Sequence, residues 1–414
     1  MRLRDLPLRV TTLTIAALVL LPAAVLLLVP RRPASGLDRL LPYAALLQSF
    51  TAQPAQPPPP LWQQRLGAAA AQRHWRNQRR LWWQFWGPHG DAGAYLVFPA
   101  APAEPLPPEA LRLDDLVVLA PSPLARQLLQ EQLKLRRRPP RGLDQRCSRS
   151  LLQREAVHWN GAALAQMLGP LSPLALSLQQ GCLLLRSEGT SLLWQGEADA
   201  STDAMQAAPA PIAIPGPADR SSSALLELRG PRLELLLRGL LSTALLRDSL
   251  AQRYGLGSEQ VRRLQGAAFV LQLRQQAKGP YRAGLDLLVQ LPGDRQLWDR
   301  WLVDLSRALT DQGLASSQPA AGLTLWSRED GAAVGGWRRL GADQLLLFLG
   351  PSSSQAPGLG AGGELWQLSV QPTALEVSGL LPSSLPLVVK RSQRLVLQGR
   401  GSGQTALAGR LELR

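Results

Sequence analysis

The side chains that most often carry enzyme chemistry are few in this sequence and do not form a known motif. The three histidines are His74, His89 and His158, and they do not have the spacing of a shared metal site. The chain contains no Gly-x-Ser-x-Gly elbow, no Walker A loop and no His-Glu-x-x-His motif. The glycine-rich run 358–363 lacks the Lys-Ser/Thr step that a phosphate-binding loop needs. We therefore predict no catalytic residue, no metal ligand and no cofactor.

The two cysteines, Cys147 and Cys182, are a pair whose chemistry depends on where the protein resides. Outside the cytoplasm an even number of cysteines indicates a disulfide. This one would close a loop of about 36 residues and contribute ~3–4 kcal/mol on the chain-entropy model. The alternative is two unrelated buried thiols, because Cys182 occupies a position that is apolar Phe269 in a similar segment. The sequence leaves both interpretations open.

Length and composition describe a globular protein rather than a nucleic-acid binder. The chain has 414 residues, 45% of them hydrophobic and 18% charged, which is enough for a sizeable core. The net charge is +15, and all of the basic residues except Lys134, Lys278 and Lys390 are arginine. Isoleucine is equally scarce, so we attribute the arginine bias to a GC-rich genome and predict no nucleic-acid partner. The arginine excess still favours anionic surfaces in general.

The amino-terminal region has the pattern of a membrane anchor. Residues 11–29 (TTLTIAALVLLPAAVLLLV) carry no charge and are long enough to span a hydrocarbon core of ~30 Å. Arg31 and Arg32 follow in place of a small-x-small cleavage site, which favours an uncleaved signal-anchor over a cleaved signal peptide or a buried core helix. We predict a short tail (1–10), one transmembrane helix (11–29) and a Pro-rich spacer (30–60). The bulk would lie outside the cytoplasm, at the plasma membrane or alternatively at a thylakoid membrane.

The segment 61–86 is rich in tryptophan and arginine and contains no acidic residue. At about 100° per residue it predicts an amphipathic helix with an indole face and a guanidinium face. Such a helix is typical of a lipid interface, whereas the alternative is a helix that packs its indoles on the protein's own sheet. The candidate membrane-surface residues are Trp75, Trp82, Trp86, Arg73, Arg76 and Arg80.

An internal repeat predicts the fold class. Three segments share the plan of a strand, a Gly/Pro turn, a leucine-rich stretch and a β-hairpin. Their opening strands are 156–161, 225–231 and 365–372, and their hairpins are 182–199, 269–291 and 395–413. We predict an α+β protein in which duplicated strand–helix–β-hairpin units form antiparallel sheets covered by helices. The first α+β domain would span 61–203, an Ala/Pro/Ser linker 204–223, and the second domain, with two repeat copies, 224–414.

Several of these features together resemble a known family. They are the anchor, Gly335-Gly336-Trp337 followed by the run 344–350 (QLLLFLG), and the repeat openings such as 225–231. With them the chain resembles a family of uncharacterised single-pass membrane proteins of photosynthetic bacteria, known as a domain of unknown function. The resemblance covers most of the chain and implies a location and an architecture, but no reaction and no ligand.

The functional expectation follows from the anchor, the Trp/Arg segment and the lack of a catalytic motif. We expect a membrane-tethered, extracytoplasmic, non-enzymatic protein of the cell envelope that binds or organises a lipid or a protein partner. The alternative is a membrane-anchored hydrolase whose site residues are scattered in sequence. A leucine-lined groove between sheet and helices would favour lipid binding, and a pocket with convergent Asp, Ser and His would favour the hydrolase.

Overall fold

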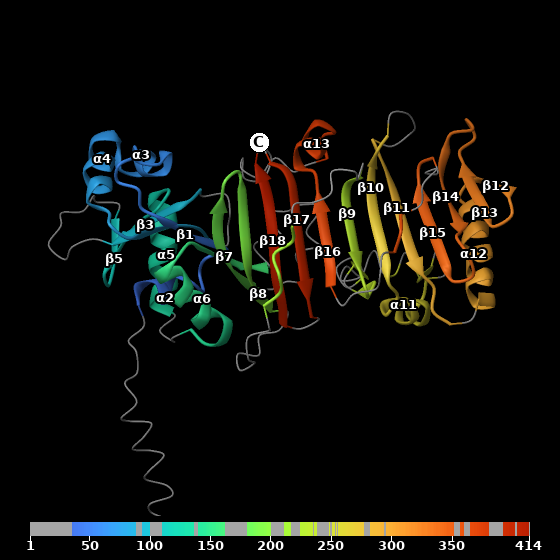
Figure 1. Cartoon of the computed structure of the whole chain (residues 1–414), viewed down its shortest axis with the longest axis horizontal. Coiled ribbons are helices and arrows are strands. Elements are labelled where there is room, and N and C mark those ends of the chain that lie inside the picture. Colours follow the sequence, from blue (N-terminus) through green and yellow to red (C-terminus); the bar gives the residue numbers. More distant parts are fainter. Residues whose placement is uncertain are drawn as a thin grey trace, which may run out of the picture.

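The strands of this protein form one sheet, although they come from both halves of the chain. The computed structural model describes residues 35–87, 93–99, 110–135, 140–161, 180–199, 211–216, 224–234, 236–237, 248, 251–252, 254, 256–276, 282–293, 295–351, 357–359, 365–380, 392–401 and 404–413. Within these ranges 18 strands hydrogen-bond side by side into a single sheet. Figure 1 shows them standing next to one another along the long axis of the molecule.

The pairings are all antiparallel and join the strands in a linear order with two open edges. From one edge to the other the strands are β4 (Ala110–Leu113), β5 (Leu116–Leu119), β3 (Tyr95–Pro99), β2 (Leu81–Trp86), β1 (Leu46–Thr51), β6 (Ala156–Asn160), β7 (Gln180–Glu188), β8 (Ser191–Asp199), β18 (Gln404–Leu413), β17 (Ser392–Arg400), β16 (Leu365–Val370), β9 (Ala224–Gly230), β10 (Phe269–Gln275), β11 (Ala283–Gln290), β15 (Gln344–Leu349), β14 (Ala333–Arg339), β13 (Leu323–Ser327) and β12 (Ala315–Ala320).

Three groups of strands have the same local topology. In β6–β7–β8, β9–β10–β11 and β16–β17–β18, the first strand pairs with the first strand of the hairpin that follows it. The third group is the last in the chain but lies between the other two, because β18 pairs with β8 and β16 pairs with β9. The most C-terminal strands therefore fill the centre of the sheet and connect its two sides.

Helices cover both faces of the sheet near β1–β3 and one face near β9–β15. Near β1–β3, one face is packed by α2 (Gly36–Leu40), α5 (Pro123–Leu135) and α6 (Gly142–Gln153), and the other by α3 (Pro60–Leu66) and α4 (Ala68–Asn77). Trp82 joins the second cluster and Trp83 the first, because successive strand residues point to opposite faces. The far helices are α11 (Ser258–Gln265) and α12 (Arg295–Thr310), and α13 (Pro372–Val377) lies at the end of β17.

The regular spacing of apolar residues explains most of these elements. In α12 the buried residues Trp298, Leu302 and Leu305 recur every three or four positions, which places them on one side of the helix. In β11 burial alternates through Gly284, Asp286 and Leu288, as expected when one face of a strand is the better covered. The short helix α2 begins at a capping box, in which Ser35 and Asp38 each accept a hydrogen bond from the other's backbone N–H.

The predicted fold class is wrong. We expected a transmembrane helix followed by repeat units in helix-covered antiparallel sheets, whereas the described strands form one continuous sheet of 18. No helix among the described residues is long and apolar enough to cross a membrane. The tail 1–10 and the predicted span 11–29 lie outside the described residues. The sheet also continues through both predicted domains, because β8 of the first hydrogen-bonds to β18 of the second.

Three local predictions also need correction. The predicted spacer 30–60 contains α2 and β1, and β1 pairs with both β2 and β6 inside the sheet. Its arginines make the stretch 136–149 resemble a loop in the sequence, but the structure places α6 in it, since Leu143, Cys147 and Leu151 recur every four residues and arginine is a good helix former. The apolar run 113–119 predicts a single strand, but Leu113 ends β4 and residues 116–119 form β5 of a hairpin, with Asp114 in its turn at φ 55.

Candidate functional site

A row of apolar side chains crosses neighbouring strands on one face of the sheet. Cross-strand partners lie on the same face because side chains alternate along each strand. The paired residues, which we call the leucine belt, are Leu397 (β17), Leu368 (β16), Leu228 (β9), Leu271 (β10), Leu287 (β11), Leu347 (β15) and Trp337 (β14). All of them belong to one apolar cluster. At about 4.8 Å per strand the belt is about 29 Å long.

Helices cover the belt only in part. Leu264 of α11 and Trp298 and Leu302 of α12 join the same cluster as Phe269, Val289 and Leu345 of the sheet. In Figure 1, α12 lies at the end of the sheet that β12 forms, whereas β16 and β17 lie near the centre of the sheet. Leu228 is buried, and the other belt side chains are half-buried. Leu233 and Leu236, which follow β9, are buried in the same cluster. The belt is thus an apolar strip that α11, α12 and the residues after β9 cover in part.

Three tryptophan–glycine pairs extend the same apolar face. Trp194 of β8 lies across Gly409 of β18, and Trp366 of β16 lies across Gly399 of β17. The third pair joins Trp159 of β6 to Gly181 of β7. A Cβ added at Gly409 would come within 2.0 Å of the indole of Trp194, so the close approach requires glycine at that position. These pairs let large rings cover the sheet without separating its strands.

A polar cavity of about 390 Å³ opens at one end of the belt strands. Its lining residues are Gln275, Gln371, Thr373, Ala374, Val377 and Gln393. In β10 Gln275 continues the alternation of Leu271 and Leu273, so it lies on the belt face. Val377 of α13 is 82% exposed at its rim. Apolar strip and amide-lined cavity therefore meet on a single face.

The opposite face of the same strands carries both a second apolar cluster and buried polar pairs. Val270, Leu288, Leu346 and Phe348 form the apolar cluster. Asp286 of β11 is fully buried there and receives two hydrogen bonds from Arg274 of β10, one of them at 2.8 Å. Next to them the side chain of Gln272 donates to Glu227 of β9 at 2.6 Å. A buried carboxylate needs such a partner because burial without one disfavours its charge strongly. Behind the belt the sheet therefore has apolar packing beside paired polar groups, so both of its faces are partly apolar.

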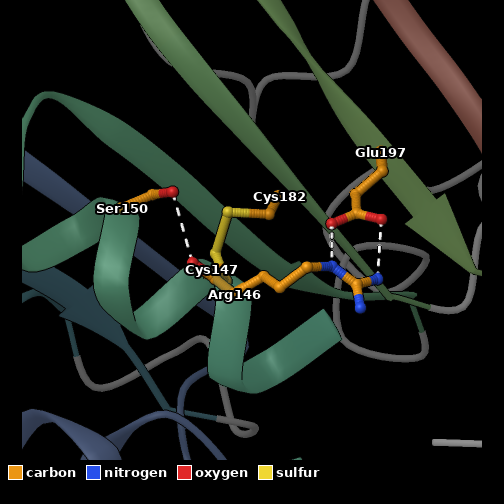
Figure 2. Close-up of polar contacts among 5 residues, drawn as sticks. All are labelled: Arg146, Cys147, Ser150, Cys182 and Glu197. Atoms are coloured by element: carbon orange, nitrogen blue, oxygen red, sulfur yellow. Dashed lines mark hydrogen bonds and ion pairs between the residues drawn. A yellow bond between two sulfur atoms is a disulfide. The ribbon is translucent and has the colours of Figure 1, made fainter. Parts of the chain in front are cut away.

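The strongest covalent feature is a disulfide that joins α6 to β7. Cys147 and Cys182 are bonded with Cα atoms 5.6 Å apart, so of the two interpretations that the sequence left open, the bridge is present. Beside it Arg146 donates two hydrogen bonds to Glu197 of β8, at 2.6 and 2.7 Å (Figure 2). This paired carboxylate raises the pKa of Arg146. Disulfide and ion pair together fix α6 on the sheet at two adjacent strands.

The residues closest to a hydrolase pattern lie where α6 packs on β6 and α2, and His158 and Ser148 among them are buried. Nε2 of His158 is 3.4 Å from a carboxylate oxygen of Asp144, and one turn later Ser148 donates to Asp38. The exposed fraction is 3% for both His158 and Ser148, so no substrate can reach them in this structure. Asp38 also accepts the backbone N–H of Ser35 in the capping box. The arrangement therefore holds α2, α6 and β6 together instead of forming a site.

The structure divides the predicted membrane-surface residues between two elements. Trp75 lies in α4, whereas Trp82 and Trp86 lie in strand β2, so the predicted continuous helix is wrong. Trp75 and Trp82 are buried with Trp62, their ring centroids lying 5.1 and 5.9 Å from its ring. Trp86 is half-buried. The arginines of this group, Arg73, Arg76 and Arg80, are all exposed.

The described residues hold no cluster of three or more metal-ligating side chains. His74 lies on α4 with its ring centroid 5.7 Å from that of Phe98, and His89 lies outside the described residues. Sequence reasoning missed the leucine belt. Its only local signal is the alternation in Leu271-Gln272-Leu273 and Leu285-Asp286-Leu287. This alternation shows which side chains share a face of their strand, but it does not show which strand lies next to it.

Comparisons with known proteins identify no relative by sequence. No family model matches the chain, and no curated protein matches it. Among solved structures it is similar to crystal forms IV, III and I of a protein named TP0453, at 13%, 12% and 14% identity. These alignments cover 44% of this chain and 72%, 72% and 70% of the other, with TM-scores of 0.27, 0.26 and 0.24. Likeness at this level carries no conclusion about the function of this chain.

Proposed function

We propose that this protein is a non-enzymatic, extracytoplasmic binding protein that holds the acyl chains of an anionic lipid on its leucine belt. The observation that carries the proposal is the uninterrupted apolar row from Leu397 to Trp337, most of whose side chains are half-buried. Soluble surfaces rarely expose contiguous apolar strips unless they bind something.

The geometry and charge of the site support a lipid as the ligand. A hydrocarbon core of ~30 Å contains two leaflets, so a single acyl chain needs about 15 Å, which is shorter than the belt. The amide-lined cavity at the strand ends supplies hydrogen-bonding side chains for a headgroup, including Gln275 and Gln393. A net charge of +15 favours anionic headgroups over neutral ones.

The disulfide supports the extracytoplasmic location. Structural disulfides persist in oxidising compartments and are rare where glutathione and thioredoxin keep thiols reduced. The exposed fraction of Cys147 is 0% and that of Cys182 is 7%, which fits a structural bridge better than a catalytic one. The burial of His158 and Ser148 makes the hydrolase the weaker alternative.

A matched pair of double variants tests the lipid proposal. Leu368→Gln with Leu397→Gln makes the belt polar at β16 and β17, where it extends beyond α11 and α12. The control, Leu124→Gln with Leu128→Gln, makes the same chemical change on α5, where these leucines are 65% and 44% exposed. Binding to dansyl-labelled phosphatidylglycerol vesicles is followed by energy transfer from tryptophan, since Trp366 lies on the belt face.

We expect the belt variant to lose at least ten-fold in lipid affinity and the α5 control to keep it. The protein should bind phosphatidylcholine vesicles more weakly than phosphatidylglycerol vesicles. Added salt should reduce this difference in affinity, because salt screens exposed charges. Circular dichroism establishes that both variants are folded. Equal lipid binding by the belt variant and the control variant would contradict the proposal. The proposal would also be contradicted if the purified protein carried no lipid and instead had a second protein bound at the belt.

A further inference from the structure

A short segment lies across the face of the sheet that is opposite the leucine belt. Residues 211–216 (PIAIPG), which we call the strap, follow β8 and precede β9 in the chain. The strap is held by side chains of three strands that donate to its backbone carbonyls. Gln195 of β8 donates to Ile212 O and Gln398 of β17 to Ala213 O, each at 2.6 Å. Arg410 of β18 donates to Pro215 O at 3.2 Å.

Two aliphatic side chains of the strap pack on the sheet, Ile212 deeply and Ile214 half-buried. We call the surface that receives them the groove. Ile212 is 4% exposed and packs on Ala406 and Ala408 of β18, which are 2% and 0% exposed. In the strand register Ala408 lies between Gln195 and Gln398, so a small residue is flanked by two long amides. Alanine at this position leaves room above the sheet, and the glutamines form the walls that reach the strap carbonyls.

The groove recognises the strap by features that another peptide could share. Its three donors contact carbonyl oxygens, which every residue carries, and its apolar floor contacts Ile212 and, less deeply, Ile214. Pro211 and Pro215 have no N–H groups that would need acceptors, and proline holds a chain extended at low entropic cost. The pattern that fits is therefore two aliphatic residues two positions apart, the second followed directly by proline, in an extended chain.

We infer that this groove is a peptide-binding site, distinct from the belt, that the strap occupies in cis. Its external ligand is an extended segment of another polypeptide with the pattern aliphatic-x-aliphatic-Pro. The strap contributes two anchoring side chains and three hydrogen bonds, while Pro211, Ala213 and Gly216 are exposed. Because a tethered segment has an effective concentration of ~mM, an external peptide competes poorly until the strap is weakened.

The test uses the full chain with Ile212→Asp, which removes the more deeply buried of the two anchoring side chains and leaves the groove residues unchanged. The probe is a fluorescein-labelled peptide with the sequence of residues 210–217, and fluorescence anisotropy measures its binding. We expect saturable binding to the I212D protein and at least ten-fold weaker binding to the unmodified protein. Adding Gln398→Ala and Arg410→Ala to I212D should abolish binding, as should aspartate in place of the first isoleucine of the peptide.

A second measurement is independent of the variant. With the unmodified protein, excess peptide should displace the strap and accelerate proteolytic cleavage within residues 200–223, while the aspartate-containing peptide should have no effect. A folded I212D protein that does not bind the peptide would overturn the inference. Equal binding by I212D and the unmodified protein would also overturn it, since the peptide would then occupy another surface.

Discussion

At the scale of single residues, the central sheet depends on glycines that face large aromatic rings. Gly181, Gly399 and Gly409 each lie under a tryptophan of the neighbouring strand. The sequence shows these glycines, but a glycine in a strand is normally a sign of weakness or of a bulge. Their role could not be predicted because each partner lies on a strand whose position is set by long-range pairing.

Gly409→Ala should destabilise the protein by about 1–3 kcal/mol, the range expected for overpacking. The new Cβ would lie 2.0 Å from the indole nitrogen of Trp194 and 2.6 Å from the carbonyl oxygen of Val396, and the backbone oxygen cannot move cheaply. Gly266→Ala is the control, because no atom lies within 4 Å of that Cβ. Urea unfolding measures both, and equal midpoints would refute the requirement for glycine.

Tyr95 should make stability depend on alkaline pH. Burial and the neighbouring Tyr43 hydroxyl raise the pKa of Tyr95 above its usual value of about 10. Its neutral form is therefore favoured in the folded state, so the stabilisation is complete below about pH 10 and is lost as pH rises further. Tyr95→Phe, which removes the 3.0 Å hydrogen bond to Ala125 O, should cost about 1 kcal/mol at neutral pH.

The measurement is urea unfolding of both proteins across the alkaline range. Because phenylalanine cannot ionise, the stability of Tyr95→Phe should fall less steeply above pH 10, and the two curves should converge. Parallel curves would show that Tyr95 does not cause the alkaline loss of stability.

At the scale of elements, local periodicity predicts what a segment is but not which segment it contacts. The apolar stripe of 297–309 predicts the helix α12, and the hairpins 182–199 and 395–413 fall on β7–β8 and β17–β18. The segment 61–86 is predicted as one helix because Trp75, Trp82 and Trp86 fit a helical stripe. In the structure, Gly67 and the run Leu81-Trp82-Trp83 divide this segment into two short helices and a strand. The leucine belt could not be predicted, because β16 joins β9 from more than a hundred residues away along the chain.

The disulfide should account for much of the attachment of α6. Replacing both cysteines by serine should lower the free energy of unfolding by ~3–4 kcal/mol, given a sequence separation of 35. Trp83, whose indole donates to Leu151 O of α6 at 2.9 Å, should lose protection from solvent as the helix loosens. Thermal unfolding with and without a reductant measures the effect. Arg146→Gln should cost less, because Arg146 and Glu197 are both partly exposed.

At the scale of the whole molecule, an open sheet of this width has two edges that must be kept from pairing with other chains. One edge is the short strand β4. The other is β12, whose six residues are all exposed and whose pairing with β13 is irregular between Ser317 and Ala320. Pro319 lies in that irregular stretch and cannot donate a backbone hydrogen bond. Short length, proline and irregular pairing are the usual protections of a sheet edge.

Pro319→Val should therefore promote association between molecules. Valine restores a backbone donor and favours an extended strand, so β12 becomes a better template for a second edge. We expect a concentration-dependent increase in apparent mass by light scattering, with little change in the free energy of unfolding. An apparent mass equal to that of the unmodified protein at every concentration would show that proline is not what protects this edge.

The position of β16–β17–β18 has a consequence for synthesis of the chain. Strand β8 is complete at residue 199 and β9 at residue 230, but their partners β18 and β16 lie within residues 365–413. A ribosome adds ~5–20 residues per second, so the nascent chain carries two unpaired strand edges for on the order of ten seconds. During that interval the exposed edges of β8 and β9 can pair with a neighbouring nascent chain. Chaperones that shield these two strands would therefore act during synthesis, before the sheet is complete.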